Sequence, residues 1–145
     1  MFGQDQPSVK AVQFEVEYKI DAPLAAEQLA DLFGRSGIRR PIDDLVRIAA
    51  MIRHANLIIT AWEAERLVGV ARSLCDYSYC CYLSDLAVDR DFQGAGIGSE
   101  LLRRTKAAAG DQSMLLLLAA PESMAFYRKI GMEAVANGWI IKRLG

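Results

Sequence analysis

Three glycines alternate with other residues in the segment from Gln93 to Ser99, which reads QGAGIGS. Glycine lets a backbone approach a ligand closely and point several N–H groups toward it. An apolar run typical of a strand precedes this segment and an amphipathic helical stripe follows it, so the positive end of a helix would face the same place. The pattern predicts a cradle for a phosphate or pyrophosphate group.

Two familiar phosphate loops do not fit this spacing. A dinucleotide fingerprint, G-x-G-x-x-G, requires glycine where this chain has Ser99, and a P-loop requires a Gly-Lys-Ser/Thr triplet that does not follow. The alternative without a ligand is that the glycines only tighten a strand-to-helix turn. One or two glycines would be enough for that purpose, so three in alternation favour the anion cradle.

The elements that position this loop follow from hydrophobic periodicity. We predict strands over residues 14–20, 57–63, 67–76, 79–88 and 114–118, with two weak strands near 133–136 and 139–142. Helices are predicted over about 23–33, 41–54, 98–109 and 123–130. This order indicates an α/β fold with a mixed sheet and helices on both faces. Residues 1–12 form a polar lead, and residues 13–145 are expected to form one domain.

Two stretches carry a family resemblance. The first, LSDLAVDRDFQGAGIGSELL (residues 83–102), contains the pattern Q-x-x-G-x-G after a strand, and the second is AFYRKIGM (residues 125–132). Both resemble the GNAT superfamily of N-acetyltransferases, and the order of elements agrees over roughly residues 14–142. The resemblance implies a mixed, mostly antiparallel sheet with a splayed parallel pair.

The resemblance also implies acetyl-CoA as co-substrate and no metal. The pantetheine arm would pair with main-chain groups of the strand before the loop, and Gln93 stands where the family has Gln or Arg. The pyrophosphate would rest on amides of the loop. The implied cofactor-binding residues are Leu86, Ala87, Val88, Gln93, Gly94, Ala95, Gly96, Ile97, Gly98 and Ser99.

Acyl transfer to an amine requires a neutral nucleophile, stabilisation of the developing oxyanion and a proton for the leaving thiolate. Tyr127 matches the tyrosine that the family often places near the thioester sulfur as general acid; the alternative is a packed aromatic beside Phe126. Asp85, in the strand that approaches the expected reaction centre, is the candidate base, acting directly or through water. Equally open is a role for Asp85 in ordering the loop or facing the substrate amine as a counter-ion.

Composition limits the partners and the compartment. The 17 basic and 18 acidic residues nearly cancel, so we expect no binding to nucleic acid. Arg35, Arg39 and Arg40 are predicted to be solvated loop charges in preference to contacts with an anionic substrate. Three cysteines, Cys75, Cys80 and Cys81, are predicted to be reduced core residues. The first residues lack the pattern of a signal peptide and the longest apolar run is too short for a bilayer, so we expect a cytoplasmic protein without a membrane partner.

Together these features predict an N-acetyltransferase. It would move an acetyl group from acetyl-CoA directly to a primary amine of a small molecule, without a cysteine-bound intermediate. The alternatives are a non-catalytic module that senses acyl-CoA, and an enzyme that acetylates a protein or peptide amine. A homodimer is the assembly that the resemblance suggests.

Overall fold

The computed structural model describes residues 14–145, so the predicted polar lead, residues 1–12, lies outside the described residues. Within this range one twisted sheet has five strands in the order β1-β2-β3-β4-β5. The strands are β1 (Glu17–Ile20), β2 (Leu57–Glu63), β3 (Arg66–Cys75), β4 (Cys80–Val88) and β5 (Met114–Leu116). The first four pair antiparallel, and β5 joins β4 in parallel. The mixed, mostly antiparallel sheet that the sequence predicts is confirmed.

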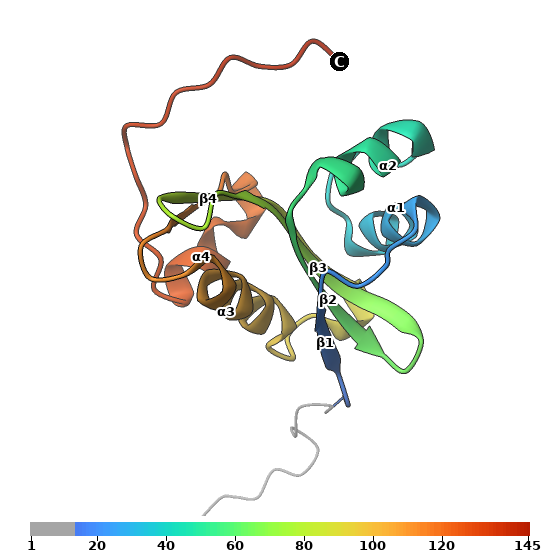
Figure 1. Ribbon diagram of the computed structural model, residues 1–145. Helices are drawn as coiled ribbons and strands as arrows, with labels where there is room; N and C mark the ends of the chain where they lie inside the picture. Colours follow the sequence, from blue (N-terminus) through green and yellow to red (C-terminus); the bar gives the residue numbers. More distant parts are fainter. Residues whose placement is uncertain (1–13) are drawn as a thin grey trace, which may run out of the picture.

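Helices lie on both sides of this sheet (Figure 1). On one side are α1 (Ala26–Ser36) and α2 (Leu45–His54), and on the other are α3 (Ile97–Ala109) and α4 (Met124–Lys129). Two single turns of 3-10 helix, η2 (Arg90–Phe92) and η3 (Pro121–Ser123), precede α3 and α4. None of the helices between residues 14 and 145 has both the length and the apolar character needed to cross a membrane.

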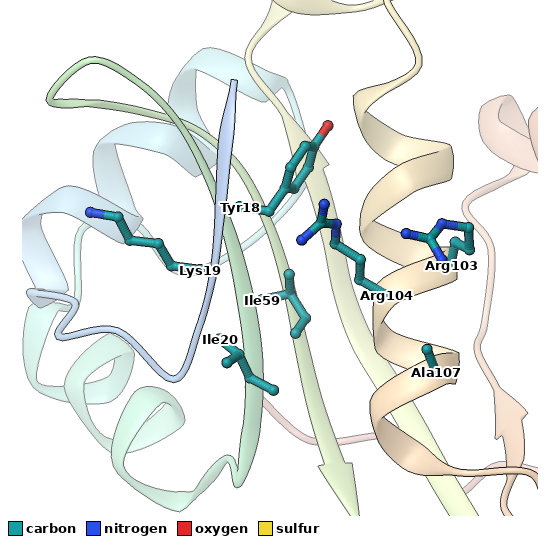
Figure 2. A pocket seen from close by; sticks show the side chains of 7 residues that line it. All are labelled: Tyr18, Lys19, Ile20, Ile59, Arg103, Arg104 and Ala107. Carbon is teal, nitrogen blue, oxygen red and sulfur yellow. The ribbon is translucent and has the colours of Figure 1, made fainter. Parts of the chain in front are cut away.

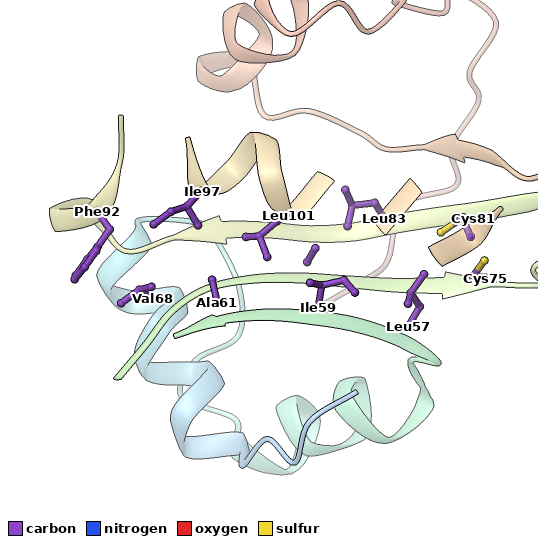
Figure 3. Packing of buried hydrophobic residues seen from close by; sticks show 12 residues of the cluster. Leu57, Ile59, Ala61, Val68, Cys75, Cys81, Leu83, Phe92, Ile97 and Leu101 are labelled. Carbon is purple, nitrogen blue, oxygen red and sulfur yellow. The ribbon is translucent and has the colours of Figure 1, made fainter. Parts of the chain in front are cut away.

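The sheet separates two hydrophobic layers. Successive strand residues point to opposite faces, so Leu57 and Ile59 contribute to one layer while Ile58 contributes to the other. Figure 3 shows the first layer, to which Ile97 and Leu101 of α3 also contribute. The second layer packs against α1 and α2. Its fully buried members from these helices are Leu29, Leu32, Phe33 and Ile48.

The parallel pair of strands opens toward the glycine segment. Only Cys80–Tyr82 of β4 pairs with Met114–Leu116 of β5, although β4 continues to Val88. Beyond Tyr82 one side of β4 therefore has no neighbouring strand among the described residues. This is the splayed pair that the sequence predicts.

The two weak strands predicted near 133–136 and 139–142 are not formed, so this prediction is wrong. All side chains of residues 133–145 are exposed, and the segment runs outward from α4 (Figure 1). Its last residue returns to α2, where the Gly145 carbonyl accepts a hydrogen bond from Arg47 Nη2 at 3.1 Å. A short apolar run such as residues 139–141 can indicate a strand, but the five-stranded sheet does not include these residues.

Candidate functional site

Main-chain groups of β4 line the opening beside β5. The Asp89 amide donates to the Val68 carbonyl at 2.9 Å, and antiparallel residues alternate between facing the partner strand and facing away. Leu86 and Val88 therefore direct their N–H and C=O groups away from β3 and into the opening, whereas those of Ala87 pair with β3. The side chain of Gln93 reaches back to this strand, because its Nε2 donates to the Val88 carbonyl at 2.9 Å.

In the glycine segment that follows, residues 93–96 are exposed and two residues are left-handed. Gly94 has φ of 85° and Gly96 has φ of 87°, and a Cβ at either position would meet no atom within 4 Å. Gly96 is the N-cap of α3, and the first intrahelical bond runs from the Glu100 amide to the Gly96 carbonyl at 3.0 Å. The amides of residues 97–99 come before that bond and have no acceptor within the helix. This segment can therefore hold an anion through main-chain N–H groups.

Gly98 serves close packing and is not left-handed. A Cβ on Gly98 would lie 3.3 Å from Phe126 Cζ and 3.8 Å from Val88 Cγ2. The missing side chain thus lets α4 approach both the start of α3 and the end of β4. Because Tyr127, the predicted general acid, follows Phe126 in α4, this contact brings Tyr127 to the same region as the opening between β4 and β5.

Tyr127 is half-buried on α4. Its ring packs edge-on against Phe126, with centroids 5.0 Å apart and an interplanar angle of 78°. Burial raises the pKa of the Tyr127 hydroxyl, and the positive charge of Arg40 acts in the opposite direction without cancelling the effect. The phenol is consequently protonated at neutral pH, and Arg40 is close enough to influence it.

Asp85 is fully buried between two arginines. Its Oδ1 accepts from Arg40 Nε and its Oδ2 from Arg72 Nε. Arg40 also donates to the Ser84 carbonyl at 2.8 Å, and Arg72 donates to the Met51 carbonyl at 3.1 Å. This cluster, Arg40–Asp85–Arg72, ties the segment between α1 and α2, and the α2 helix itself, to the two central strands. Both carboxylate oxygens are already engaged, which favours an ordering role.

A second cluster of the same kind lies at the end of β4. Asp89 is buried and accepts from Arg35 Nη1 and, at 2.9 Å, from Arg66 Nη2. Although burial acts to raise the pKa of Asp89, hydrogen bonds from the Asp91 amide and Arg35 lower it overall. Arg35 also donates to the Leu67 carbonyl at 3.0 Å. The end of α1 is therefore anchored at the residue that begins the turn into the glycine segment.

These clusters correct the prediction that Arg35, Arg39 and Arg40 are all solvated loop charges. Only the Arg39 side chain is exposed, because buried carboxylates hold the other two. The sequence reasoning also missed Arg72. A signal was available, since Arg72 interrupts an apolar strand and the neighbouring strand carries Asp85, its partner in register.

The cysteine prediction holds for two of the three residues. Cys75 and Cys81 are buried free thiols, and burial raises the pKa of Cys81 to about 11. Cys80 is exposed, so its assignment to the core is wrong. Its alternate position on the strand explains this, because neighbours in a strand face opposite sides. In residues 14–145 no group of three His, Cys, Asp or Glu side chains could hold a metal ion.

A shallow depression of about 340 Å³ lies elsewhere, between β1 and α3 (Figure 2). Its cations are engaged by protein groups: Glu100 pairs with Arg103 and Arg104, and the Arg104 guanidinium stacks 4.4 Å from the Tyr18 ring centroid. None of the predicted site residues lines it. We therefore place the candidate site at the opening of β4 and β5.

Similarity to known proteins concerns the family and the fold of this chain. A family model described as an acetyltransferase (GNAT) domain matches residues 54–133, which is more than half of the chain. The chain belongs to the GNAT acetyltransferase family. An uncharacterized N-acetyltransferase, ycf52, of Porphyra purpurea is 32% identical over 120 residues, covering 77% of this chain and 65% of that protein. A histone acetyltransferase of Glycine max, TAP1, is 32% identical over 78 residues, covering 52% of this chain and 34% of that protein.

Solved GNAT structures have the same fold. A GNAT family acetyltransferase of Streptococcus pneumoniae matches with a TM-score of 0.67 and 21% identity, covering 89% of this chain and all of that one (100%). An aminoglycoside N-acetyltransferase in complex with CoA matches with a TM-score of 0.66 and 13% identity, covering 94% of this chain and 100% of that chain. At such identities the likeness concerns the fold alone.

Proposed function

We propose that this GNAT protein transfers an acetyl group from acetyl-CoA directly to a primary amine of a small molecule. The observation that carries the proposal is the continuous path from the opening beside β4 to the glycine segment and the start of α3. Acetyl-CoA supplies a thioester as acyl donor, and the protein has to hold its arm and its phosphates. No cysteine intermediate is needed, since the raised pKa keeps Cys81 protonated and Cys80 lies at the far end of β4 from the glycine segment.

The residues present fit acetyl-CoA. The Leu86 carbonyl and the Val88 N–H, which face the opening, would pair with the amide-bearing arm in the manner of an added strand. The left-handed glycines leave the surface of the segment open, and the unpaired amides of residues 97–99 would bind the pyrophosphate at the positive end of α3. The bond from Gln93 to the Val88 carbonyl holds the segment against the strand.

The reaction chemistry would divide between main chain and side chain. We propose that the Leu86 N–H polarises the thioester carbonyl and stabilises the developing negative charge. Tyr127 would donate its proton to the departing thiolate. Burial raises the pKa of its hydroxyl and so keeps it protonated, and the positive charge of Arg40 limits how far this pKa rises. The amine has to arrive neutral, or lose its proton to water.

Of the three roles expected for Asp85, namely base, ordering the loop and counter-ion to the substrate amine, we propose the ordering role. A base must be able to take a proton, but both oxygens of Asp85 accept hydrogen bonds from guanidinium groups, and its side chain is 0% exposed. Asp85 would instead hold Arg40 and thereby the segment between α1 and α2 that borders the acceptor side. The exposed Arg39 in that segment would favour an acceptor that carries a carboxylate or phosphate.

A protein or peptide amine is the second candidate acceptor, because one relative is named a histone acetyltransferase. The nearly balanced net charge of this chain provides no overall attraction for a basic protein tail, which is why we place the small-molecule acceptor first. We propose a cytoplasmic location, supported by three free cysteines, of which Cys75 and Cys81 lie opposite each other on neighbouring strands without a disulfide.

Calorimetric titration with acetyl-CoA, with NADH and ATP as controls, tests the first step. Turnover is then followed as thiol release from acetyl-CoA against two matched panels, one of small amines with and without anionic groups and one of lysine-bearing peptides. Binding of acetyl-CoA alone and turnover with small amines is the expected result. Binding without turnover on either panel would indicate the sensing module, turnover on peptides alone would indicate a protein acceptor, and no binding would overturn the proposal.

A further inference from the structure

Two cysteines face each other across β3 and β4. Cys75 is in register with Cys81, both are free thiols, and both belong to the hydrophobic layer to which α3 contributes. Figure 3 shows the two side chains at the same end of this layer. The proposed acetyl transfer uses neither thiol, so what this pair can do is independent of that proposal.

The hydrogen bonds around the pair define its spacing. The Asp76 amide donates to the Cys80 carbonyl at 3.1 Å, so the adjacent position, Cys75 with Cys81, is a non-hydrogen-bonded pair of the antiparallel ladder. Accordingly, the main chain of Cys75 faces away from β4: its amide donates to Asn56 Oδ1 at 2.8 Å, and its carbonyl accepts from Asn56 Nδ2 at 2.6 Å. The Cα atoms of such a pair lie about 4.5 Å apart, within the range of roughly 4.4–6.8 Å that a disulfide bridges.

The two thiols differ in access to solvent. Cys75 ends β3 directly before the exposed turn of residues 76–79 and is 7% exposed, whereas Cys81 is fully buried. Tyr77 holds this turn over Cys75, because its amide donates to Cys75 Sγ at 3.3 Å and its hydroxyl donates to the Asn56 carbonyl at 2.9 Å. Tyr77 has φ of 61°, a left-handed conformation that is unfavourable for a residue with a Cβ. When this strained turn opens, a small oxidant reaches Cys75 before Cys81.

The surroundings of Cys81 suit a thiol that reacts second. Burial and the neighbouring Cys75 raise the pKa of Cys81 to about 11, so its thiol stays protonated and is a poor target for an oxidant by itself. The Ser73 hydroxyl acts to lower the pKa of Cys81, and this buried hydroxyl has no other hydrogen-bond partner in residues 14–145. A hydroxyl donor that is otherwise unused can stabilise the Cys81 sulfur as it gives up its proton.

We propose that Cys75 and Cys81 are a modification site at which a hydroperoxide forms an intramolecular disulfide. In the first step the Cys75 sulfur attacks a peroxide oxygen, the O–O bond breaks, and Cys75 sulfenic acid forms with release of water or an alcohol. In the second step the Cys81 sulfur attacks the Cys75 sulfur, the S–O bond breaks, and the hydroxide leaves as water with the Cys81 proton. Two thiols are oxidised, one peroxide is reduced, and a thiol reductant reverses the change. The bond locks the hairpin where β4 still pairs with β5.

Cys80→Ser removes the exposed third thiol and provides the chain on which the pair is tested. Hydrogen peroxide added to the folded variant should lower the intact mass by two hydrogen atoms and remove both thiols from titration after denaturation, without linking two chains on a non-reducing gel. Dithiothreitol should restore both thiols. Retention of both thiols, a gain of oxygen in place of the loss of two hydrogens, or a linkage between chains would overturn the proposal.

Chymotryptic fragments locate the bond in the wild-type chain. Cleavage after Tyr77 and Tyr79 separates Cys75 from the two later cysteines, so a bond from Cys75 keeps two fragments together until they are reduced. After oxidation of the folded protein and alkylation of the remaining thiols, the linked fragments should carry the alkyl label on Cys80. The same oxidation in urea, where the fold does not select a partner, should give mixed pairs. A bond to Cys80 in the folded protein would overturn the assignment.

Alanine variants of the Cys80→Ser chain separate the two steps. With Cys81→Ala added, the Cys75 sulfenic acid has no second thiol to react with, and it should accumulate as an adduct with dimedone. With Cys75→Ala added, a dimedone adduct on Cys81 should form far more slowly, because Cys81 is buried and protonated. Circular dichroism confirms that each variant is folded. Adducts that form equally fast on Cys75 and Cys81 would overturn the order of the two steps.

Discussion

Gly96→Ala tests whether the left-handed glycine segment holds the phosphates of acetyl-CoA. Gly96 has φ of 87° and ψ of 5°, and a methyl group there would meet no atom within 4 Å. The cost of the substitution therefore comes from the backbone and not from a clash. For a residue with a Cβ the left-handed conformation costs about 1–2 kcal/mol relative to the right-handed one.

This strain energy can appear in two places. If the segment keeps its conformation, the free energy of unfolding falls by the same 1–2 kcal/mol or so. If the segment relaxes in the free protein, the strain returns when the ligand requires the original shape, and affinity falls by about 5- to 30-fold. In both cases the methyl group would project into the open space beside the segment, where the pyrophosphate would rest. We therefore expect acetyl-CoA to bind about 5- to 30-fold more weakly.

Gly110→Ala is the matched control. Gly110 ends α3 with φ of 95° and ψ of 163°, a region almost restricted to glycine, and a Cβ there also meets no atom within 4 Å. Urea denaturation should show a loss of stability in this variant at least as large as in Gly96→Ala, and calorimetric titration should show unaltered affinity for acetyl-CoA. If Gly96→Ala binds acetyl-CoA as tightly as Gly110→Ala does, the amides near Gly96 do not hold the phosphates.

Three further predictions concern side chains. Tyr127→Phe should lower kcat by about 10²- to 10⁴-fold with little change in affinity for acetyl-CoA. Because burial raises the pKa of Tyr127 above its usual 10.0, the kcat of the wild type should fall only as pH rises through that higher value. Steady-state kinetics that show neither effect would assign Tyr127 to packing. Asp85→Asn should lower the free energy of unfolding by about 3–5 kcal/mol, because it leaves the guanidinium of Arg72 buried without its counter-ion. A loss below about 1 kcal/mol in urea denaturation would contradict this role of Asp85. Hydrogen bonds from Arg103 and Arg104 lower the pKa of Glu100 to about 2, so Glu100→Gln should lower the free energy of unfolding by about 0.3–0.5 kcal/mol above pH 4.5. This difference from wild type should vanish as pH falls toward 2. Thermal unfolding at both pH values measures it.

Local patterns were sufficient to predict the elements around the site. The strand that ends at Val88, the glycine segment and the helix that follows were all read from neighbouring residues, because glycine spacing and helical periodicity are properties of a short window. The resemblance in residues 83–102 and 125–132 extended this to the splayed parallel pair. The predicted strands of 133–136 and 139–142 were wrong, because a strand also depends on a neighbouring strand, and a local pattern contains no information about that neighbour.

The roles of the charged residues depended on contacts between distant parts of the chain. Sequence alone placed Arg40 in a loop and Asp85 in a strand 45 residues later, and nothing in either window indicates that the two bond. Tertiary packing decided that Asp85 is enclosed by Arg40 and Arg72, and that Arg40 lies close enough to Tyr127 to affect its pKa. Backbone conformation follows from residues a few positions apart, and the sequence by itself determined it around the glycine segment. Electrostatic environment follows from burial and from neighbours in space, so only the tertiary structure could decide which carboxylate is free to react.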